Sequence, residues 1–254
     1  MSGTYPDLSG AVVVVTGGSR GIGARTAREF AAQGARVCVV GRDTAALDGV
    51  VAGITEDGGT ALAVAADVTD AAAIGHVRER VEAELGPASV LCAFAGGQGM
   101  PVPTLQLTER RWREVIDADL TSAFLTVSAF LPGMAERGRG SVITMSSASG
   151  RQPSRANLAY GAANAGLVML TRHLANEMGP QGVRVNCIAP SAIATERVDQ
   201  LMPGDIRARV AADHPLGRIG TPHDVAQAAL FLASDASDWL TGLTIDVAGG
   251  RITN

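Results

Sequence analysis

The sequence predicts a doubly wound α/β fold, in which helices cover both faces of one parallel sheet. Short β-branched runs alternate with helical segments along the whole 254-residue chain, and this order is typical of α/β proteins. The strand-like runs are almost continuously apolar, as expected for parallel strands that are buried on both faces. No linker, composition break or internal repeat interrupts the pattern. We therefore expect a single domain over residues 1–254.

The elements can be assigned in chain order. AVVVVTGG is a strand that ends in glycines, and GARTAREFAAQG then repeats small and apolar residues at helical spacing up to Gly34. Six more strands are predicted in RVCVVG, TALAVAAD, ASVLCAFAGG, GSVITMSS, VRVNCIAP and GLTIDVAGG. The helices between them are predicted in TAALDGVVAGI, DAAAIGHVRERVEAEL, RWREVIDADLTSAFLTVSAFLPGM, the segment around Tyr160 and DVAQAALFLAS. The sheet should therefore have seven strands.

One connection is longer and more polar than a plain link between a strand and a helix. It covers residues 190–220. Long loops of this kind are often mobile and functional. We expect it to be a substrate lid.

Composition limits the classes of partner. The net charge is −4 and no basic run offsets it, so neither nucleic acid nor an anionic membrane surface is expected to bind. No apolar run approaches the length of a membrane span, and no charged, apolar leader opens the chain. Cys38, Cys92 and Cys187 lie in apolar runs and suit buried free thiols in a reducing compartment. We expect a cytoplasmic protein that acts on a small molecule.

Two kinds of catalytic site find no support in the residue spacing. No Cys/His cluster has the spacing of metal ligands, so no metal site is expected. The four histidines share no spacing with a serine or cysteine that would indicate a hydrolase triad.

The segment TGGSRGIG, residues 16–23, stands where the first strand meets the first helix. In doubly wound sheets this is the nucleotide crevice. Gly17 suits a tight turn, Gly21 lets the backbone approach a pyrophosphate, and Gly23 lets the helix pack on the strand. The helix N-terminus adds N–H donors and a positive dipole. These features predict a Rossmann-type dinucleotide site.

The end of the second strand bears on the choice of nucleotide. Gly41 and Arg42 stand where an NAD-binding chain usually carries Asp or Glu. Arg42 and Arg20 could pair with a 2′-phosphate instead, so NADP(H) is expected. The alternative cofactor is NAD(H), because Asp43 follows and could serve it. The structural alternative is that both arginines are solvated surface residues. Asp67 could accept a hydrogen bond from the adenine amine or cap a helix.

These residues resemble the short-chain dehydrogenase/reductase family over essentially the whole chain. TGGSRGIG matches the family's TGxxxGIG segment, and Ser147 precedes Tyr160 by the usual thirteen positions. VRVNCIAPSAIAT resembles the stretch that lines the nicotinamide, and GLTIDVAGG resembles the C-terminus of tetrameric members.

The resemblance implies a Tyr that exchanges the carbonyl/alcohol proton, a Ser that positions the oxygen, a Lys four residues after the Tyr and an Asn in the preceding long helix. Here the Lys position is Asn164 and the Asn position is Asp119. The usual NNAG segment reads AFAG at residues 93–96, and Ser191 follows Pro190 where Gly is common. The catalytic candidates are Ser147, Tyr160, Asn164 and Asp119. The implied cofactor residues are Gly17, Ser19, Arg20, Gly21, Ile22, Gly23, Arg42, Asp67, Val68, Ala95, Gly96, Tyr160, Asn164, Pro190, Ile193 and Thr195.

Loss of the lysine has a physical consequence for Tyr160. A free phenol has a pKa of about 10, and a cation about 4 Å away lowers it by about three units at an effective dielectric near 20. Asn164 supplies no charge, although it could still donate to the ribose hydroxyls. Asp119, if ionised and close to Tyr160, would raise the pKa of the phenol. Alcohol oxidation should therefore suffer more than ketone reduction, because a neutral phenol remains a proton donor.

Each candidate also has a structural alternative. Asp119 could simply bond to backbone across the cleft. Ser147 competes with Ser146 and Ser149, which could satisfy backbone groups at the strand end. Tyr160 could be an ordinary helical tyrosine.

Three functions compete. The leading one is an NADP(H)-dependent ketone reductase with an altered proton relay. The others are a nucleotide-binding protein without redox activity, and an isomerase, dehydratase or cyclase that uses Tyr160 and Asp119 as an acid–base pair.

A homotetramer is also expected. The helices around residues 112–134 and 155–178 carry more apolar and small residues than one sheet-facing stripe requires. These residues are Phe124, Leu125, Phe130, Ala159, Ala162, Ala163 and Gly166.

Overall fold

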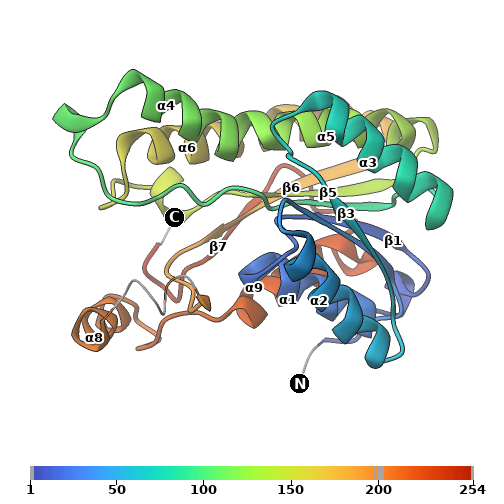
Figure 1. The fold of residues 1–254 in the computed structure, drawn as a ribbon, viewed down its shortest axis with the longest axis horizontal. Helices are drawn as coiled ribbons and strands as arrows, with labels where there is room; N and C mark the ends of the chain where they lie inside the picture. The colour runs from blue at the N-terminus through green and yellow to red at the C-terminus, as the bar shows by residue number, and fades with distance from the viewer. Residues whose placement is uncertain (1–2, 197, 199–202, 253–254) are drawn as a thin grey trace.

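A computed structural model describes residues 3–196, 198 and 203–252 and confirms the predicted sheet. Seven parallel strands run in the order β3-β2-β1-β4-β5-β6-β7 (Figure 1). The strands are β1 (Val12–Thr16), β2 (Arg36–Gly41), β3 (Thr60–Ala65), β4 (Val90–Ala93), β5 (Gly140–Met145), β6 (Val183–Pro190) and β7 (Thr244–Val247). The helices are α1 (Gly21–Ala32), α2 (Thr44–Glu56), α3 (Ala71–Glu84), α4 (Glu109–Ile116), α5 (Ser122–Glu136), α6 (Leu158–Met178), α8 (Gly204–Ala212) and α9 (Pro222–Ala233).

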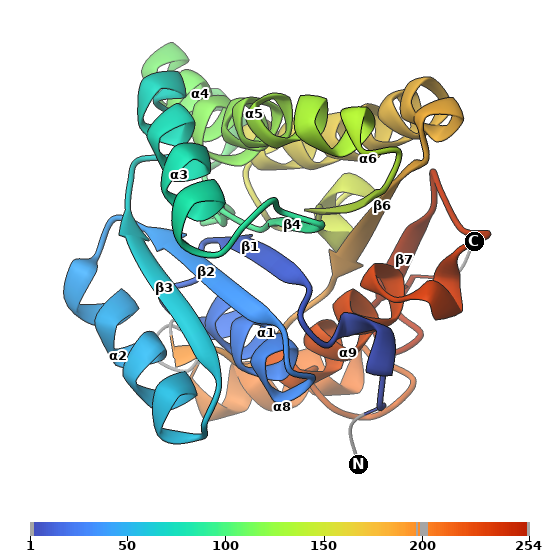
Figure 2. The same cartoon turned by 90° about the vertical axis from the view of Figure 1, so that its right-hand side faces the viewer.

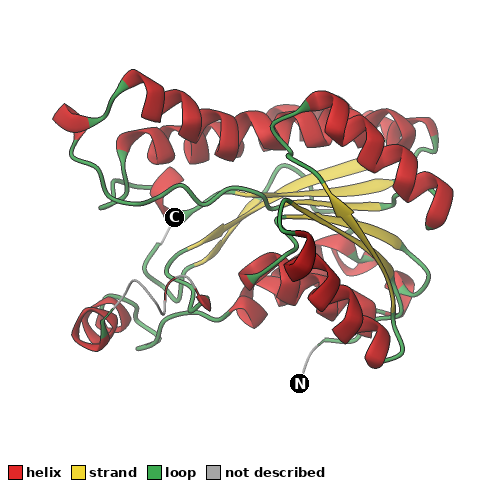
Figure 3. Ribbon diagram, in the orientation of Figure 1, coloured by secondary structure: helices red, strands yellow, loops and turns green. Residues whose placement is uncertain are grey.

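Helices lie on both faces of the sheet, as Figure 3 shows. α3, α4, α5 and α6 cover one face, and α1, α2 and α9 cover the other (Figures 1 and 2). The chain runs outward from β1 through β2 to β3, and then returns to the other side of β1 with β4. At such a switch point the connections leave in opposite directions and open a crevice beyond the carboxyl ends of the strands.

Each face of the sheet has its own apolar core. In β1, Val13 and Val15 face the core shared with α1, α2 and α9, whereas Val12 and Val14 face the core shared with α3, α5 and α6. All four side chains are at most 2% exposed. The near-continuous apolar runs in the sequence therefore reflect burial on both faces.

The predicted long helix is wider at one point. α4 and α5 are joined without a break by a π-helical turn, Asp117–Thr121. The combined helix, Glu109–Glu136, is long and apolar enough to cross a membrane by length and composition, but a core helix of a globular protein passes the same test. Here Phe130 and Met134 are buried against the sheet.

The segment predicted to be a lid is described only in part. Residues 197 and 199–202 lie outside the described residues. The described part holds α8 and a short parallel bridge between Ile193 and Gly220, which brings the two ends of the segment together. Closure of this segment over a substrate stays a prediction.

Three of the apolar and small residues on which the homotetramer prediction rested lie in the chain's own core. Phe130 is 4% exposed, and Ala159 and Ala163 are 0% exposed. α6 packs against β6, α4 and the π-helical turn, so small residues on α6 allow close packing within the chain. Phe124, in contrast, is 53% exposed.

The three cysteines are free and buried. Burial raises the pKa of Cys38 to about 12 and also raises the pKa values of Cys92 and Cys187.

Candidate active site

The glycine-rich turn after β1 has the conformation that its sequence predicts. Gly17 and Gly21 have φ values of +66° and +54°, which favour glycine. A Cβ on Gly23 would lie 2.2 Å from the carbonyl oxygen of Gly17. Gly23 therefore lets α1 pack against the turn itself rather than against the strand.

Five helix starts in the described chain have a side-chain cap, whereas those of α1 and α8 have none. Asp43, Asp70, Thr108, Asn157 and Thr221 cap α2, α3, α4, α6 and α9 with side-chain oxygens. Among the described residues, no side chain caps α1. Its first N–H groups are therefore suited to an anion, as the helix dipole favours.

Thr195 lies beside this same turn. A Cβ on Gly21 would meet Thr195 Cγ2 at 3.2 Å. The stretch after β6 and the turn after β1 therefore meet, as a dinucleotide lying across the switch point requires. The residues present fit the pyrophosphate of such a cofactor.

At the predicted adenosine end, the two arginines differ. Arg20 Nη2 lies 2.6 Å from Asp43 Oδ2, and Asp43 also caps α2 by accepting from the Ala46 N–H. Arg42 is exposed. Gly41 faces Ser19, because a Cβ there would lie 3.4 Å from Ser19 Oγ. Arg20 is thus in the predicted place but is already paired.

Asp67 does not cap a helix. Its Oδ1 accepts from the backbone N–H and the hydroxyl of Thr69 at 3.0 and 2.7 Å. These two bonds hold the pKa of Asp67 below its usual range. Asp70 caps α3 instead, so the helix-cap alternative for Asp67 is wrong. Asp67 is exposed at the end of β3.

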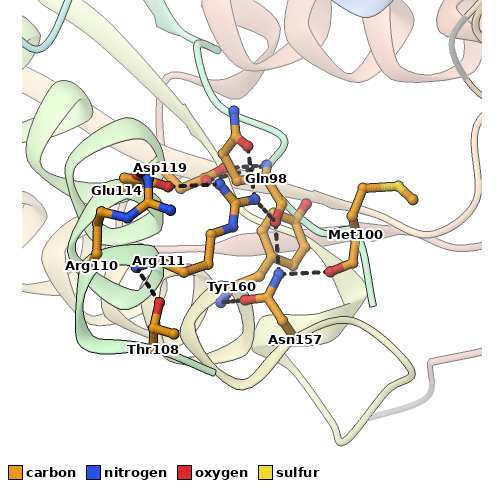
Figure 4. A network of polar contacts seen from close by, with 9 residues as sticks. All are labelled: Gln98, Met100, Thr108, Arg110, Arg111, Glu114, Asp119, Asn157 and Tyr160. Carbon is orange, nitrogen blue, oxygen red and sulfur yellow. Dashed lines mark hydrogen bonds and ion pairs between the residues drawn. The ribbon is translucent and has the colours of Figure 1, made fainter. Parts of the chain in front are cut away.

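Asp119 belongs to the π-helical turn and reaches the segment after β4 (Figure 4). It is 4% exposed. Its Oδ1 accepts from the Gly97 N–H, and its Oδ2 accepts from the Gln98 N–H at 3.2 Å. Gly96, with φ of +140°, passes so close that a Cβ would lie 2.5 Å from Asp119 Oδ1. The backbone-bonding arrangement considered for Asp119 is therefore present.

The three serines after β5 have different partners. The buried Ser146 hydroxyl donates to the Asn164 carbonyl at 2.8 Å, and the Ser149 hydroxyl accepts from Ser154 at 2.8 Å. Ser147 is half-buried, and its hydroxyl accepts from the Ser149 N–H at 3.2 Å. All three serines thus have structural partners, and Ser147 caps the short 3-10 turn Ala148–Gly150.

Tyr160 and Asn164 lie one turn apart on α6. Asn164 is 2% exposed, and its Nδ2 donates to the Tyr160 carbonyl at 2.9 Å. One of its two amide donors is therefore used inside the helix. A Cβ on Gly150 would lie 2.5 Å from the Asn164 carbonyl carbon. The turn that begins after Ser147 thus packs directly on α6 at the position where the family carries lysine.

The residues after β6 explain a departure from the family pattern. Ser191 Oγ lies 2.9 Å from His214 Nε2, and His214 Nδ1 lies 2.6 Å from the Val210 carbonyl. A carbonyl only accepts, so in the neutral ring Nδ1 carries the hydrogen and Nε2 accepts from the Ser191 hydroxyl. Ser191 thus ties the end of β6 to the end of the α8 segment. Ile193 is 5% exposed and packs in the core.

Three residues of this site were not predicted from the sequence: Gln98, Arg111 and Asn157. Arg111 Nη2 donates to Gln98 Oε1 at 3.0 Å, and Asn157 donates to the Gln98 carbonyl at 2.7 Å (Figure 4). The asparagine ahead of an apolar helical run is a helix-cap signal. Its partner in the segment after β4 is 59 positions away, and no local pattern indicates that contact.

Comparison with known proteins decides the family. A family model described as enoyl-(acyl carrier protein) reductase matches residues 17–251. The chain belongs to the short-chain dehydrogenase/reductase family. It is 40% identical to the cis-4-hydroxycyclohexanecarboxylate dehydrogenase of Sinomonas cyclohexanicum over 239 residues, which cover 94% of this chain and 95% of the relative.

Solved structures agree in fold and differ in cofactor. A proposed NAD(P)-dependent gluconate 5-dehydrogenase from Beutenbergia cavernae, with NADP bound at low occupancy, gives a TM-score of 0.91 at 35% identity and covers 97% of this chain and 98% of its own. A 3-oxoacyl-[acyl-carrier protein] reductase from Brucella melitensis with bound NAD gives 0.91 at 32% identity and covers 98% and 94%. A short-chain oxidoreductase that uses a nicotinamide dinucleotide is thus supported, but not the choice between the two dinucleotides.

Proposed function

We propose that this protein is an NADP(H)-dependent reductase of small ketones, with Tyr160 as the proton donor. The observation that carries the proposal is the Asn164 carboxamide, which is buried and donates to the Tyr160 carbonyl at 2.9 Å. The family's lysine position therefore holds no cation. Without the charge of that lysine, a phenol gives a proton more readily than it takes one at neutral pH.

The nicotinamide, when bound, supplies the hydride. Ser147 holds the carbonyl oxygen of the substrate by a hydrogen bond from its hydroxyl. Tyr160 donates its proton to the same oxygen as negative charge develops there. The reverse reaction needs the tyrosinate, which Asn164 does not stabilise by charge.

The choice of NADP(H) rests on Gly41 and Arg42. The lack of a carboxylate at the end of β2 removes the usual partner of the ribose hydroxyls, and the exposed Arg42 suits a 2′-phosphate. Arg20 contributes less, because a phosphate must compete with Asp43 for it.

Several broader features belong to the same proposal. The substrate is a small alicyclic ketone, in keeping with the cyclic alcohol named for the Sinomonas relative. The enzyme works in the cytoplasm as a homotetramer, with the exposed Phe124 of α5 and Met169 of α6, 53% and 60% exposed, in subunit contacts. The described part of residues 190–220 forms a lid over the substrate.

An anaerobic titration with NADPH and NADH, followed by a panel of cyclic ketones, tests the proposal. We expect binding of NADPH and its oxidation by at least one ketone. Tight binding without turnover on any ketone would favour the nucleotide-binding alternative. Turnover of a substrate without a change in NADPH absorbance would favour the acid–base alternative.

A further inference from the structure

The segment after β4 forms part of the surroundings of Tyr160. A Cβ on Gly99 would lie 3.0 Å from Tyr160 Cε1, so the backbone at Gly99 lies directly against the phenol ring. Figure 4 shows Gln98 and Met100 on the same segment, close to Tyr160. The position of residues 98–100, which we call the Gly99 loop, therefore limits where the ring can lie.

Asn157 joins this loop to the helix of Tyr160. Its Oδ1 accepts from the Tyr160 N–H at 2.9 Å. Its Nδ2 donates to the Gln98 carbonyl at 2.7 Å and to the Met100 carbonyl at 2.9 Å. The two carbonyls stand on either side of Gly99. The orientation of the carboxamide is fixed by its partners, because an N–H can only donate and a carbonyl can only accept.

Asn157 carries hydrogen-bond donors that a helix cap does not need. Ser, Asp and Asn cap helices about equally well, because each offers an oxygen to the first turn. Of these, only Asn also offers two N–H donors. Asn157 is 1% exposed, so loss of its donors leaves the two loop carbonyls without these partners in a part-buried place.

The other contacts of the loop are made at one end. Asp119 accepts from the N–H groups of Gly97 and Gln98, and Arg111 donates to Gln98. Beyond Gly99, the Met100 carbonyl accepts from Asn157. The part of the Gly99 loop that touches the phenol ring is thus held from two sides. Arg111 of α4 and Asp119 of the π-helical turn hold one side, and Asn157 holds the other.

We propose that Asn157 is a positioning residue, which clamps the Gly99 loop against Tyr160 and so fixes the phenol for proton transfer. The catalytic part of this inference rests on the proposed reductase function. A misplacement of a reacting group by about 1 Å can cost about 100-fold in rate, so a clamp of this kind acts on kcat rather than on cofactor binding.

The test separates the cap from the clamp. Asn157→Ser keeps a capping oxygen and replaces the two amide donors by one hydroxyl on a shorter side chain, which cannot bond to both loop carbonyls. Asn157→Ala removes the cap and the donors. We expect Asn157→Ser to lower the melting temperature by less than Asn157→Ala does, to keep the Kd for NADPH, and to lower kcat for ketone reduction by about tenfold or more. Amide hydrogen exchange at residues 97–100 should accelerate by about tenfold or more, while exchange in α6 stays unchanged. Asn157→Ala should add a loss of melting temperature.

Gly99→Ala approaches the same contact from the loop. Its Cβ would crowd the phenol ring, so kcat should fall without a change in the Kd for NADPH. The effects of Gly99→Ala and Asn157→Ser should not add, because both act through one contact. Gly75→Ala is the matched control, since a Cβ on Gly75 meets nothing within 4 Å.

Hydrogen exchange decides the clamp independently of activity. An Asn157→Ser protein with wild-type loop exchange overturns the proposal, whatever its activity. Faster loop exchange with wild-type kcat also overturns it, because the clamp would then not position Tyr160. If the wild-type protein reduces no ketone, the proposed function fails, and loop exchange alone shows whether Asn157 clamps the loop.

Discussion

The two ends of the crevice are built from different parts of the chain. At the proposed pyrophosphate end, the features that suit a ligand come from backbone: two glycines with positive φ, the close approach of Gly23 to Gly17, and a helix start without a side-chain cap. At the catalytic end, the work falls to side chains, and two of the family's four side chains are replaced by Asn164 and Asp119. A backbone site keeps its chemistry as long as the glycines remain, whereas a side-chain site changes with one substitution.

Asn164→Lys should give the largest effect, because it restores a charge at the catalytic end. We expect alcohol oxidation at pH 7 to rise by about 10²-fold, since a nearby cation contributes ~3–4 kcal/mol toward the phenolate. The basic limb of the pH profile for alcohol oxidation reports the ionisation of the tyrosine, and it should move from about pH 10 towards about pH 7. The Kd for NADPH should change little.

Asn164→Met is the control for this substitution, because it adds length without charge. Steady-state kinetics across pH 6–10 compare the three proteins. An equal gain in Asn164→Met would show that shape rather than charge limits oxidation. Rapid oxidation by the wild-type protein at pH 7 would show that another group activates Tyr160.

At the adenosine end, Arg42→Ala should weaken NADPH binding by about tenfold and leave NADH binding unchanged. One charge-assisted hydrogen bond is worth ~1.5–3 kcal/mol, which is enough for that factor. Arg20→Ala should have a smaller effect, because its guanidinium is already paired with Asp43. Calorimetric titration of the wild-type protein and the two variants with NADPH and NADH measures these affinities. Equal losses in the two variants would contradict the difference that we draw between the arginines.

The smallest effect is expected away from both ends, at the start of α9. Arg218 donates two hydrogen bonds to Asp224, which also accepts from Thr221. The Arg218 guanidinium, as the largest favourable contact, and Thr221 hold the pKa of Asp224 well below its usual range. A lowered carboxyl pKa stabilises the fold above the unfolded-state value of about 3.9, and this contribution is lost as the pH falls through the folded-state value.

Asp224→Asn should therefore lower the melting temperature by about 2–4 °C at pH 7, and this difference should shrink under acid conditions. Kd for NADPH and kcat should not change. Asp235→Asn is the control, because its pair with Arg139 is long and exposed. A constant difference across pH would show that the capping geometry, rather than the charge of Asp224, stabilises α9.

The sheet could be predicted because its signals are local. Each strand is a short apolar run, and burial of β1 on both faces explains why that run does not alternate. The glycine turn was predicted for a similar reason, since φ at Gly17 and Gly21 depends on residue type. The spacing of Ser147 and Tyr160 predicted the strand end and the helix that carry the candidate catalytic residues, β5 and α6.

The parts that were not predicted depend on contacts between distant residues. The pairing of Arg20 with Asp43 joins a turn to the next helix start. The burial of Ala159 and Ala163 depends on how α6 meets the sheet, and small residues in a sequence do not show whether they pack within a chain or between chains. The use of Asp70 rather than Asp67 as the cap of α3 depends on where the helix begins. The roles of Gln98 and Asn157 depend on a loop and a helix separated by 59 positions.

The π-helical turn, Asp117–Thr121, limits how the long helix can change in length. A π-helical turn holds one residue more than an α-helical turn, because its hydrogen bonds run from i to i+5 rather than from i to i+4. Removing one residue from this turn would therefore leave a continuous α-helix in which Phe130 and Met134 still face the sheet. The contact that depends on the extra residue is that of Asp119, which lies in the turn and accepts from the Gly97 N–H. A deletion elsewhere in α4 or α5 would instead rotate the two parts of the helix relative to each other by about 100°.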